Sequence, residues 1–341
     1  MKLLFIKLKL IGDALILTGV IRAVKRTMPG AEIHVVVRKG AEGILAGCPE
    51  IDVIHTAGDK KERGAARLKS ELALVRRLRA KAFDHVFELG DGDRGRTLAL
   101  LSGARRRHAN LYRIKSGFWR RIFAGSPTVI HDGRHAVTWD TGVVGGSLGL
   151  ELGEPAPVFV RERASFEWVD GLGLGAAPVF IHPVASREGK TWRVEGWAEV
   201  VRHFRARNVP VILSCGPSPA ECELCEAIVR EAGPEGVFKT EGRLGWASVA
   251  GALYRSRLYV GLDTAAMHLA AACGRPVVAL FAMPPESFPT FWGPLGVRRI
   301  LLTPPEGEIT PKNIPVSRVI SAVETPGFAD GAGVASASSD A

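Results

Sequence analysis

The stretch KLKLIGDALILTG, residues 7–19, places a carboxylate where α/β proteins often carry out chemistry. It follows the apolar run LLFI, so it lies at the turn between a predicted strand and a helix predicted over 13–27. Nucleotide-binding domains usually keep a glycine-rich phosphate loop there, whereas this turn has one glycine, Gly12, followed by Asp13. A carboxylate at this point suits general-base catalysis, in which it accepts a proton from an attacking hydroxyl. Simple N-capping of the following helix is the alternative, and this stretch alone favours it.

A hydroxyl and an ammonium follow another predicted strand. The segment IHPVASREGKTW places Ser186 and Lys190 in the loop after the strand PVFI. Groups of these types at the carboxyl end of a strand suit the binding of a diphosphate.

The segment YVGLDTAAMHLAAACGRP predicts an anion site at a helix N-terminus. An apolar strand runs into Asp263 and Thr264, an N-cap pair, and a helix of small residues is predicted over 264–273. The first N–H groups of that helix and its dipole would attract an anion, and Ala265 and Ala266 are small enough to let a ligand approach the backbone. Plain capping of a packed helix is the alternative, and the lysine one βα layer away favours the anion site.

Two common nucleotide-binding signatures are excluded. No G-x-G-x-x-G follows a predicted strand, and EGKT at 188–191 lacks the first glycine of a P-loop because position 184 is valine. The remaining hypothesis is that the second half of the chain holds a phosphate while the first half presents Asp13 to a hydroxyl nucleophile. If the electrophile is a sugar carbon bearing a nucleoside diphosphate, in-line attack would invert the anomeric centre.

Short β-rich runs alternate with helical patterns through both halves of the chain, which predicts parallel sheets covered by helices. We predict an α/β protein with two doubly wound, Rossmann-like domains facing across a cleft, because ligands of such folds bind beyond the carboxyl ends of the strands. The predicted domains span residues 1–160 and 161–326, joined by a connection within 150–177. A Gly/Ser/Ala-rich tail over 327–341 is predicted to be disordered.

Composition supports a globular protein of two domains. The chain has 341 residues, of which 46% are hydrophobic and 23% charged. Its apolar runs fall short of the ~20 residues of a membrane-spanning helix, and its N-terminus lacks a signal-peptide layout, so we predict a cytoplasmic location. The net charge of +10 predicts an acidic partner.

The five cysteines are odd in number and scattered, which favours reduced thiols over a disulfide framework. Cys222 and Cys225 form a C-x-x-C within a helix predicted over 218–232, without a second pair of metal-binding residues nearby. We interpret them as small, partly buried helix residues rather than a redox or zinc motif.

Two basic segments lie in the first half, RRRH at 105–108 and YRIKSGFWRRIF at 112–123. The second mixes cations with Phe118, Trp119 and Phe123, which suits contact with anionic lipid. A solvated basic face with the aromatic residues in the core is an equal alternative. Stacked aromatics with arginine also occur in nucleic-acid-binding proteins, but no RNA-binding module is present, so we predict no nucleic-acid partner.

Over roughly residues 2–320 the chain resembles the ADP-heptose–lipopolysaccharide heptosyltransferases, glycosyltransferase family 9. The N-terminal match is K-x-x-x-x-G-D, from Lys7 to Asp13, and TMPGAEIHVVV and CPEIDVIH resemble the family's second and third strands. HAVTW at 135–139 is similar to a segment of the third-heptose (core branch) type. IHPVASREGKTW resembles the donor loop, and GLDTAAMHLAAACGRPVVALF resembles the family's most specific signature.

The resemblance implies a GT-B fold and inverting, metal-independent transfer of heptose from ADP-heptose to the inner core of lipopolysaccharide. It implies no cofactor, and a peripheral enzyme at the inner face of the cytoplasmic membrane. By position, Asp13 corresponds to the catalytic base, and the N-terminal motif supplies acceptor contacts at Lys7, Lys9 and Gly12. The donor contacts implied are Ser186, Lys190, Asp263, Thr264, Ala265, Ala266 and His268, with either Glu221 or Glu223 at the nucleoside.

Two positions depart from the family pattern, and a third is assigned to the site by the resemblance alone. Ala265 and Val184 stand where the family often has glycine, which leaves open a related transferase that uses another nucleotide sugar. His268, one turn into an apolar helix, would by itself be read as a core residue, and only the resemblance assigns it to the donor. It has no second metal-ligating residue at suitable spacing, so we predict no metal site. A non-catalytic homologue that binds glycolipid or nucleotide is a further alternative.

Overall fold

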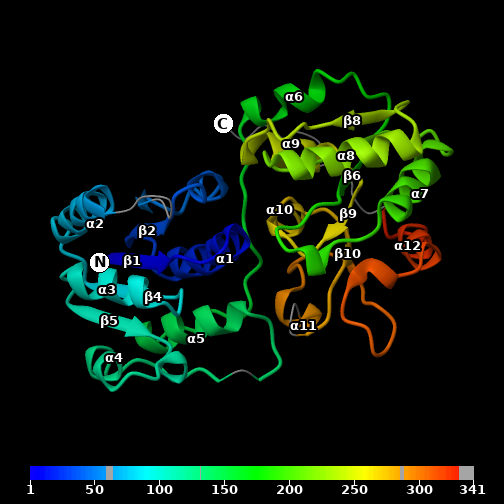
Figure 1. The fold of residues 1–341 in the computed structure, drawn as a ribbon. Coiled ribbons are helices and arrows are strands. Elements are labelled where there is room, and N and C mark those ends of the chain that lie inside the picture. Colours follow the sequence, from blue (N-terminus) through cyan, green and yellow to red (C-terminus); the bar gives the residue numbers. More distant parts are fainter. Residues whose placement is uncertain (59–63, 131, 285–287, 330–341) are drawn as a thin grey trace. The chain divides into compact units, whose positions relative to one another are not determined.

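The computed structural model describes residues 1–58, 64–130, 132–284 and 288–329 (Figure 1). The chain divides into two compact units, Met1–Val160 and Arg161–Ala341. Each unit is built on one parallel sheet.

The first unit has a five-stranded parallel sheet in the order β3-β2-β1-β4-β5. Its strands are β1 (Lys2–Lys7), β2 (Glu32–Arg38), β3 (Val53–Ala57), β4 (His85–Glu88) and β5 (Arg106–Ala109). Its helices are α1 (Ile11–Thr27), α2 (Gly64–Arg79), α3 (Asp93–Leu101), α4 (Gly117–Ile122) and α5 (Val137–Leu148), with short 3-10 helices η1 (Glu42–Ile44) and η2 (Leu111–Arg113).

Burial on both faces explains why β1 reads as a nearly continuous apolar run. One face of the sheet carries Leu4 and Ile6 into a core completed by α2 and α3. The other face carries Leu3 and Phe5, and there α1 packs against α5. The side chain of Lys7, the last residue of β1, lies on this second face and reaches α5.

The second unit has a six-stranded parallel sheet in the order β11-β10-β9-β6-β7-β8. Its strands are β6 (Val179–His182), β7 (Val211–Leu213), β8 (Val237–Lys239), β9 (Leu258–Leu262), β10 (Val277–Leu280) and β11 (Arg299–Leu302). Its helices are α6 (Glu167–Asp170), α7 (Val194–Arg205), α8 (Pro219–Ala232), α9 (Trp246–Arg255), α10 (Ala265–Ala272), α11 (Pro289–Trp292) and α12 (Val316–Val323), with 3-10 helices η3 (Arg163–Phe166), η4 (Glu188–Lys190) and η5 (Pro311–Asn313).

Helices cover both faces of this second sheet, as Figure 1 shows. Helices α7, α8 and α12 share one core with alternate strand residues such as Val179 and Ile181. Helices α9 and α10 pack against each other, and α10 contacts β9 and β10. Because successive side chains of a strand point to opposite faces of the sheet, the strands contribute to two cores, one on each face.

The order of the strands reverses once in each sheet. In the first, β1 is followed by β2 and β3 on one side, and the chain then returns to place β4 and β5 on the other. In the second, β6 is followed by β7 and β8, and β9 begins the opposite side. Crevices beyond the carboxyl ends of strands at such reversals are the usual ligand sites of α/β sheets.

The predicted alternation is confirmed, and the two doubly wound sheets are present. The strands β5 and β11 were not predicted, because the segments RRRH and RRILL have arginines where an apolar strand was expected. Helix α1 begins at Ile11 rather than 13, so Gly12 and Asp13 lie in its first turn. The predicted disordered tail lies outside the described residues from position 330 onward. Within the described part of the chain, every helix falls short of the length and apolarity needed to cross a bilayer.

Candidate functional site

The reversal point of the second sheet lies between β6 and β9, which pair in parallel register. The loop after β6 carries Ser186 and Lys190, and the loop after β9 carries Asp263 and Thr264. Residues 73 or more positions apart in sequence thus meet at one edge of the sheet because their strands are neighbours.

Lys190 and Asp263 are in direct contact across this edge. The Lys190 Nζ donates to Asp263 Oδ2 at 2.5 Å, and the two side chains are 16% and 8% exposed. The lysine ends the 3-10 helix η4, and the following Trp192, 3% exposed, donates its indole N–H to the Ile314 carbonyl at 3.0 Å. The ammonium is therefore held on an anchored turn at the carboxyl end of β6.

The N-terminus of α10 opens beside this ion pair. Thr264 is the N-cap with extended backbone (φ −142°, ψ 174°), and the first helical bond runs from the Met267 N–H to the Thr264 carbonyl at 3.1 Å. The N–H groups of Ala265 and Ala266 precede that bond and have no partner within the helix. Thr264 is the N-cap residue as predicted, but its Oγ1 is buried and makes no cap bond.

The small residues of α10 differ in position. Ala265 is half-buried at the helix start, whereas Ala266 is 1% exposed and packs inward. His268, one turn on, is 5% exposed within the same helix. Of the two alanines at the start of α10, only Ala265 therefore presents its side chain at the surface.

The other residues of the loop after β6 divide between surface and core. Ser186 is exposed in the bend before η4. Val184, where the family often has glycine, is 2% exposed and belongs to the core shared by α7, α8 and α12. The valine side chain is therefore accommodated by the core.

Of the two glutamates considered for the nucleoside, Glu221 faces the loop after β7. Its Oε2 accepts the Gly216 N–H at 2.7 Å, at the carboxyl end of the neighbouring strand. Glu223 is exposed further along α8. This placement favours Glu221 as the residue nearer the strand edge.

The reversal point of the first sheet, between β1 and β4, holds Asp13. Its Oδ2 accepts the Leu10 N–H at 3.1 Å, so the carboxylate does help to cap α1. The side chain is largely buried, with the residue 9% exposed. The capping alternative and a catalytic role are compatible, since one backbone donor fixes the orientation of the carboxylate.

Two ion pairs surround Asp13. Lys7 Nζ donates to both carboxylate oxygens of Asp140 on α5, at 2.8 and 2.6 Å. Burial by itself lowers the pKa of Lys7, but the carboxylates of Asp140, Asp13 and Asp91 outweigh it and raise that pKa above its usual value. Lys9 Nζ lies 3.1 Å from Asp91 Oδ2 and so joins the loops after β1 and β4. Lys7 is committed to an internal pair, and its contact with an acceptor stays a prediction.

Glu88, at the carboxyl end of β4, is a titratable group that sequence reasoning missed. It is 1% exposed, its Oε1 accepts the Gly90 N–H at 2.9 Å, and its Oε2 has no hydrogen-bond partner among the described residues. Burial raises the pKa of Glu88 to about 7, Asp91 adds to the effect and Arg96 opposes it. The signal was available in the sequence, because a glutamate is the next-to-last residue of the apolar run HVFEL.

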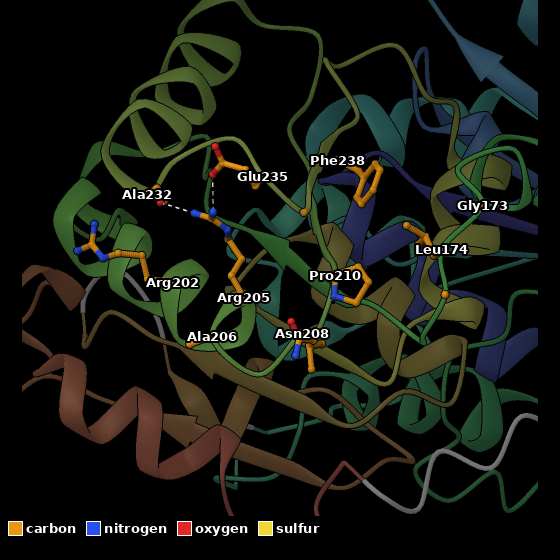
Figure 2. Close-up of a pocket in the computed structure, with 13 residues that line it drawn as sticks. Gly173, Leu174, Arg202, Arg205, Ala206, Asn208, Pro210, Ala232, Glu235 and Phe238 are labelled. Carbon is orange, nitrogen blue, oxygen red and sulfur yellow. Dashed lines mark hydrogen bonds and ion pairs between the residues drawn. The ribbon is translucent and has the colours of Figure 1, made fainter.

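A pocket of about 660 Å³ lies at the other end of the second sheet (Figure 2). Pro210 and Gly236 immediately precede β7 and β8, and both line it, so it opens at the amino ends of these strands. Arg205 turns across it to Glu235 and to the Ala232 carbonyl. None of the predicted donor residues lines this pocket, so we do not assign the donor to it.

The basic segment 112–123 is divided between surface and core. Phe123 is fully buried and Trp119 packs partly against the core, whereas Phe118 is 60% and Tyr112 51% exposed. The neighbouring cations Lys115, Arg120 and Arg121 are exposed. Each alternative of the sequence analysis therefore holds for some of the aromatic residues.

Two doubly wound parallel sheets, each with polar side chains at its reversal point, define a protein of the GT-B class. The family model of glycosyltransferase family 9 (heptosyltransferase) matches residues 71–312. The chain belongs to this family and is a glycosyltransferase.

Named relatives and solved structures agree with this assignment. The chain is 26% identical over 291 residues to lipopolysaccharide heptosyltransferase 3 of Escherichia coli, covering 83% of each chain. It is 24% identical to the lipopolysaccharide core heptosyltransferase OpsX of Haemophilus influenzae, covering 82% of this chain and 78% of the relative. The fold is similar to a family 9 glycosyltransferase of Veillonella parvula (TM-score 0.83, 20% identity, 95% and 96% covered) and to E. coli heptosyltransferase WaaC with ADP (TM-score 0.80, 19% identity, 95% and 99% covered).

Proposed function

We propose that this protein transfers heptose from ADP-heptose to the inner core of lipopolysaccharide, with inversion of the anomeric centre and without a metal ion. The second unit binds the donor and the first unit binds the acceptor. The observation that carries the proposal is the Lys190–Asp263 pair beside the open N-terminus of α10, at the reversal point of the second sheet. The E. coli and H. influenzae relatives, which are named as lipopolysaccharide heptosyltransferases, supply the substrate class.

The donor's diphosphate fits the cationic and backbone groups of this edge. An ammonium and the free N–H groups at a helix start both favour a dianion. Asp263 would repel the phosphates. Its proposed role is therefore to hold Lys190 in place and to accept hydrogen bonds from the hydroxyl groups of the donor substrate. Two hydroxyl groups, the buried Thr264 Oγ1 and the exposed Ser186 Oγ, are further hydrogen-bond donors for the diphosphate in this proposal. Glu221 contacts the nucleoside from the next loop, and His268 supports the donor side of α10.

Asp13 acts as the general base. A carboxylate that accepts the proton of the attacking hydroxyl makes the oxygen nucleophilic as the bond to the leaving diphosphate breaks. The Leu10 N–H orients this carboxylate, and the Lys7–Asp140 pair holds the end of β1 against α5. Lys9 and Gly12, at the same turn, contact the acceptor in this proposal.

The test uses purified protein, ADP-heptose and a truncated lipopolysaccharide acceptor, for wild type and Asp13→Asn. We expect the wild type to transfer heptose, and Asp13→Asn to lose about 10²–10⁴-fold in kcat while ADP affinity changes less than about twofold. The product's anomeric configuration, determined by NMR, should be inverted relative to the donor.

Each other outcome corrects a named part of the proposal. Wild-type protein that binds no ADP-heptose but binds another nucleotide sugar would replace the donor. Binding of ADP-heptose without transfer to any core acceptor would favour a non-catalytic homologue. Normal transfer by Asp13→Asn would remove Asp13 as the base.

In the proposed reaction the acceptor is an amphiphile at a membrane. We therefore propose that the protein works in the cytoplasm and docks transiently on the inner membrane surface. The part that docks is the α4 surface. This surface comprises Tyr112, Lys115, Phe118, Arg120 and Arg121, all exposed. Its aromatic residues and cations suit an anionic bilayer interface. Co-sedimentation should show binding to vesicles containing anionic phospholipid and loss of that binding in Phe118→Ser. Equal binding to neutral vesicles, or no effect of Phe118→Ser, would remove this surface.

A further inference from the structure

Three cysteines of the second unit lie together beside the loop that carries the nucleoside candidate. Cys215 follows β7, while Cys222 and Cys225 lie in the first two turns of α8. The sulfur atoms of Cys215 and Cys222 are 3.6 Å apart. The C-x-x-C of the sequence analysis thus has a third thiol beside it, which comes from the loop before the helix.

The three thiols share a cavity of about 330 Å³, large enough to admit a small reagent. Cys222 is partly exposed, and Cys215 is 8% exposed, so the sulfur atoms lie below a surface opening. The cavity is completed by two acids and two bases, Glu226, Lys239, Glu241 and Arg243.

The surroundings of Cys215 stabilise a thiolate. The neighbouring thiols of Cys225 and then Cys222 lower the pKa of Cys215 below that of an ordinary cysteine, and the Gly242 backbone acts in the same direction, against the opposing effects of burial and Glu221. The other two cysteines of the chain are different: burial raises the pKa of Cys273, and it raises that of Cys48 to about 12. The neighbouring Cys215 thiol likewise raises the pKa values of Cys222 and Cys225. Thiolates, not thiols, react with oxidants, so Cys215 is the reactive cysteine of the cluster.

We propose that Cys215 is an oxidation site that forms a reversible disulfide with Cys222, with hydrogen peroxide as the oxidant. Among the described residues no group of histidine, cysteine or acidic side chains is arranged to hold a metal ion, which favours thiol oxidation over metal binding at this cluster.

The reaction is a two-electron oxidation in two steps. The Cys215 thiolate attacks one peroxide oxygen, the O–O bond breaks, and the products are Cys215 sulfenic acid and hydroxide, which takes up a proton to give water. The Cys222 sulfur then attacks the Cys215 sulfur, the S–O bond breaks, and the departing hydroxyl leaves as water with the proton of the Cys222 thiol. One peroxide and two thiols thus give one disulfide and two waters.

The bond would close a ring around the nucleoside loop, a consequence that rests on the proposed function. The segment between Cys215 and Cys222 contains Gly216 and Glu221, which are already hydrogen-bonded to each other. The loop has little room, because a Cβ added at Gly242 would lie 2.4 Å from the Gly216 carbonyl oxygen. Shortening the S–S separation from 3.6 Å to about 2.05 Å ties the two ends of this loop together, and we expect weaker ADP binding.

The test is disulfide mapping on the full chain, reduced and then treated with hydrogen peroxide. A single tryptic peptide, 208–230, contains all three cysteines, and cleavage after Glu221 and Glu223 separates them. We expect free thiols to fall from five to three, a Cys215–Cys222 disulfide after the second cleavage, and full reversal by dithiothreitol. Cys222→Ser should form no such bond and should accumulate Cys215 sulfenic acid, trapped with dimedone. Cys48→Ser and Cys273→Ser are the matched controls and should react as wild type does.

A bond from Cys215 to Cys225, an oxidised Cys48 or Cys273, or five thiols that survive peroxide would each overturn the proposal. Calorimetry with ADP tests the consequence separately: oxidation should weaken binding about tenfold in wild type and should have no effect in Cys222→Ser. Equal affinity of the oxidised and reduced forms would overturn the coupling. A reduced protein that binds no ADP would overturn the proposed donor site, while the disulfide map still decides the thiol chemistry.

Discussion

The two reversal points share a topology but differ in charge and in burial. Each has a lysine that contacts an aspartate from a distant element: Lys7 with Asp140 in the first unit, and Lys190 with Asp263 in the second. The first pair is 7% and 6% exposed and lies among further carboxylates. The second is 16% and 8% exposed and lies beside the small residues and free N–H groups of α10.

This difference separates two uses of one kind of contact. A fully buried ion pair cannot exchange its partner for a ligand without exposing a charge to the protein interior, so the Lys7–Asp140 pair fixes β1 against α5. The more accessible Lys190 can move from Asp263 to an arriving anion at low cost. In the proposed function, similar pairs on similar sheets would thus position the base in one unit and bind the donor in the other.

Replacing Lys7 should give the largest effect of this comparison. Lys7→Met leaves the Asp140 carboxylate buried and unpaired, and we expect the free energy of unfolding to fall by about 3–5 kcal/mol in chemical denaturation. The double variant Lys7→Met with Asp140→Leu should regain most of this loss, because it removes both charges. If the free energy of unfolding of Lys7→Met falls by less than about 1 kcal/mol, the pair is not shielded from solvent.

Glu88 makes the carboxylate-rich reversal point sensitive to pH. Its folded-state pKa of about 7 lies above the ordinary value of 4.5, so the folded state binds the proton more tightly and wild-type stability falls as pH rises from 4.5 through 7. Glu88→Gln lacks this loss, and its stability relative to wild type should rise by roughly 3 kcal/mol between pH 5 and pH 8. Thermal unfolding across that range measures the difference. The exposed Glu223→Gln is the control, and a flat difference for Glu88→Gln would contradict the assignment.

Lys190→Met should weaken ADP binding about 10- to 100-fold, because one charge-assisted contact to phosphate is removed. Its effect on the free energy of unfolding should be smaller than that of Lys7→Met, since Lys190 is more exposed than Lys7, at 16% against 7%. Arg230→Met removes an exposed cation of the same unit and should leave ADP affinity unchanged. If Lys190→Met destabilises the fold as Lys7→Met does and binds ADP normally, the two pairs have the same role.

The smallest effect distinguishes the two glutamates of α8. Glu221→Gln should weaken ADP binding about fivefold, because its carboxylate lies against the loop at the carboxyl end of β7. Glu223→Gln should change it less than twofold, since that side chain is exposed. The reverse order, measured by calorimetry, would assign the nucleoside contact to Glu223.

Periodicity predicted most of the strands because a parallel sheet covered on both faces requires apolar runs such as LLFI and PVVALF. It failed for β5 and β11, because each begins with an exposed arginine and is buried only toward its end. The sequence predicted three site residues, Asp13, Lys190 and Asp263, because each directly follows a strand or lies within the first turns after it. Asp140 was missed because nothing in its helix marks it, and it lies 133 residues from Lys7.

The sequence by itself therefore determined the class of fold, the family and the polar residues that end each strand, since these depend on local pattern and short motifs. Only the tertiary structure decided which of those residues meet. The order of the strands sets which loops are neighbours, and this brought Lys190 to Asp263. The packing of α5 brought Asp140 to Lys7, and the connection from β7 into α8 brought Cys215 to Cys222. Burial, which is a property of the whole packed unit, then decided that Glu88 holds its proton near neutral pH and that Val184 lies in the core.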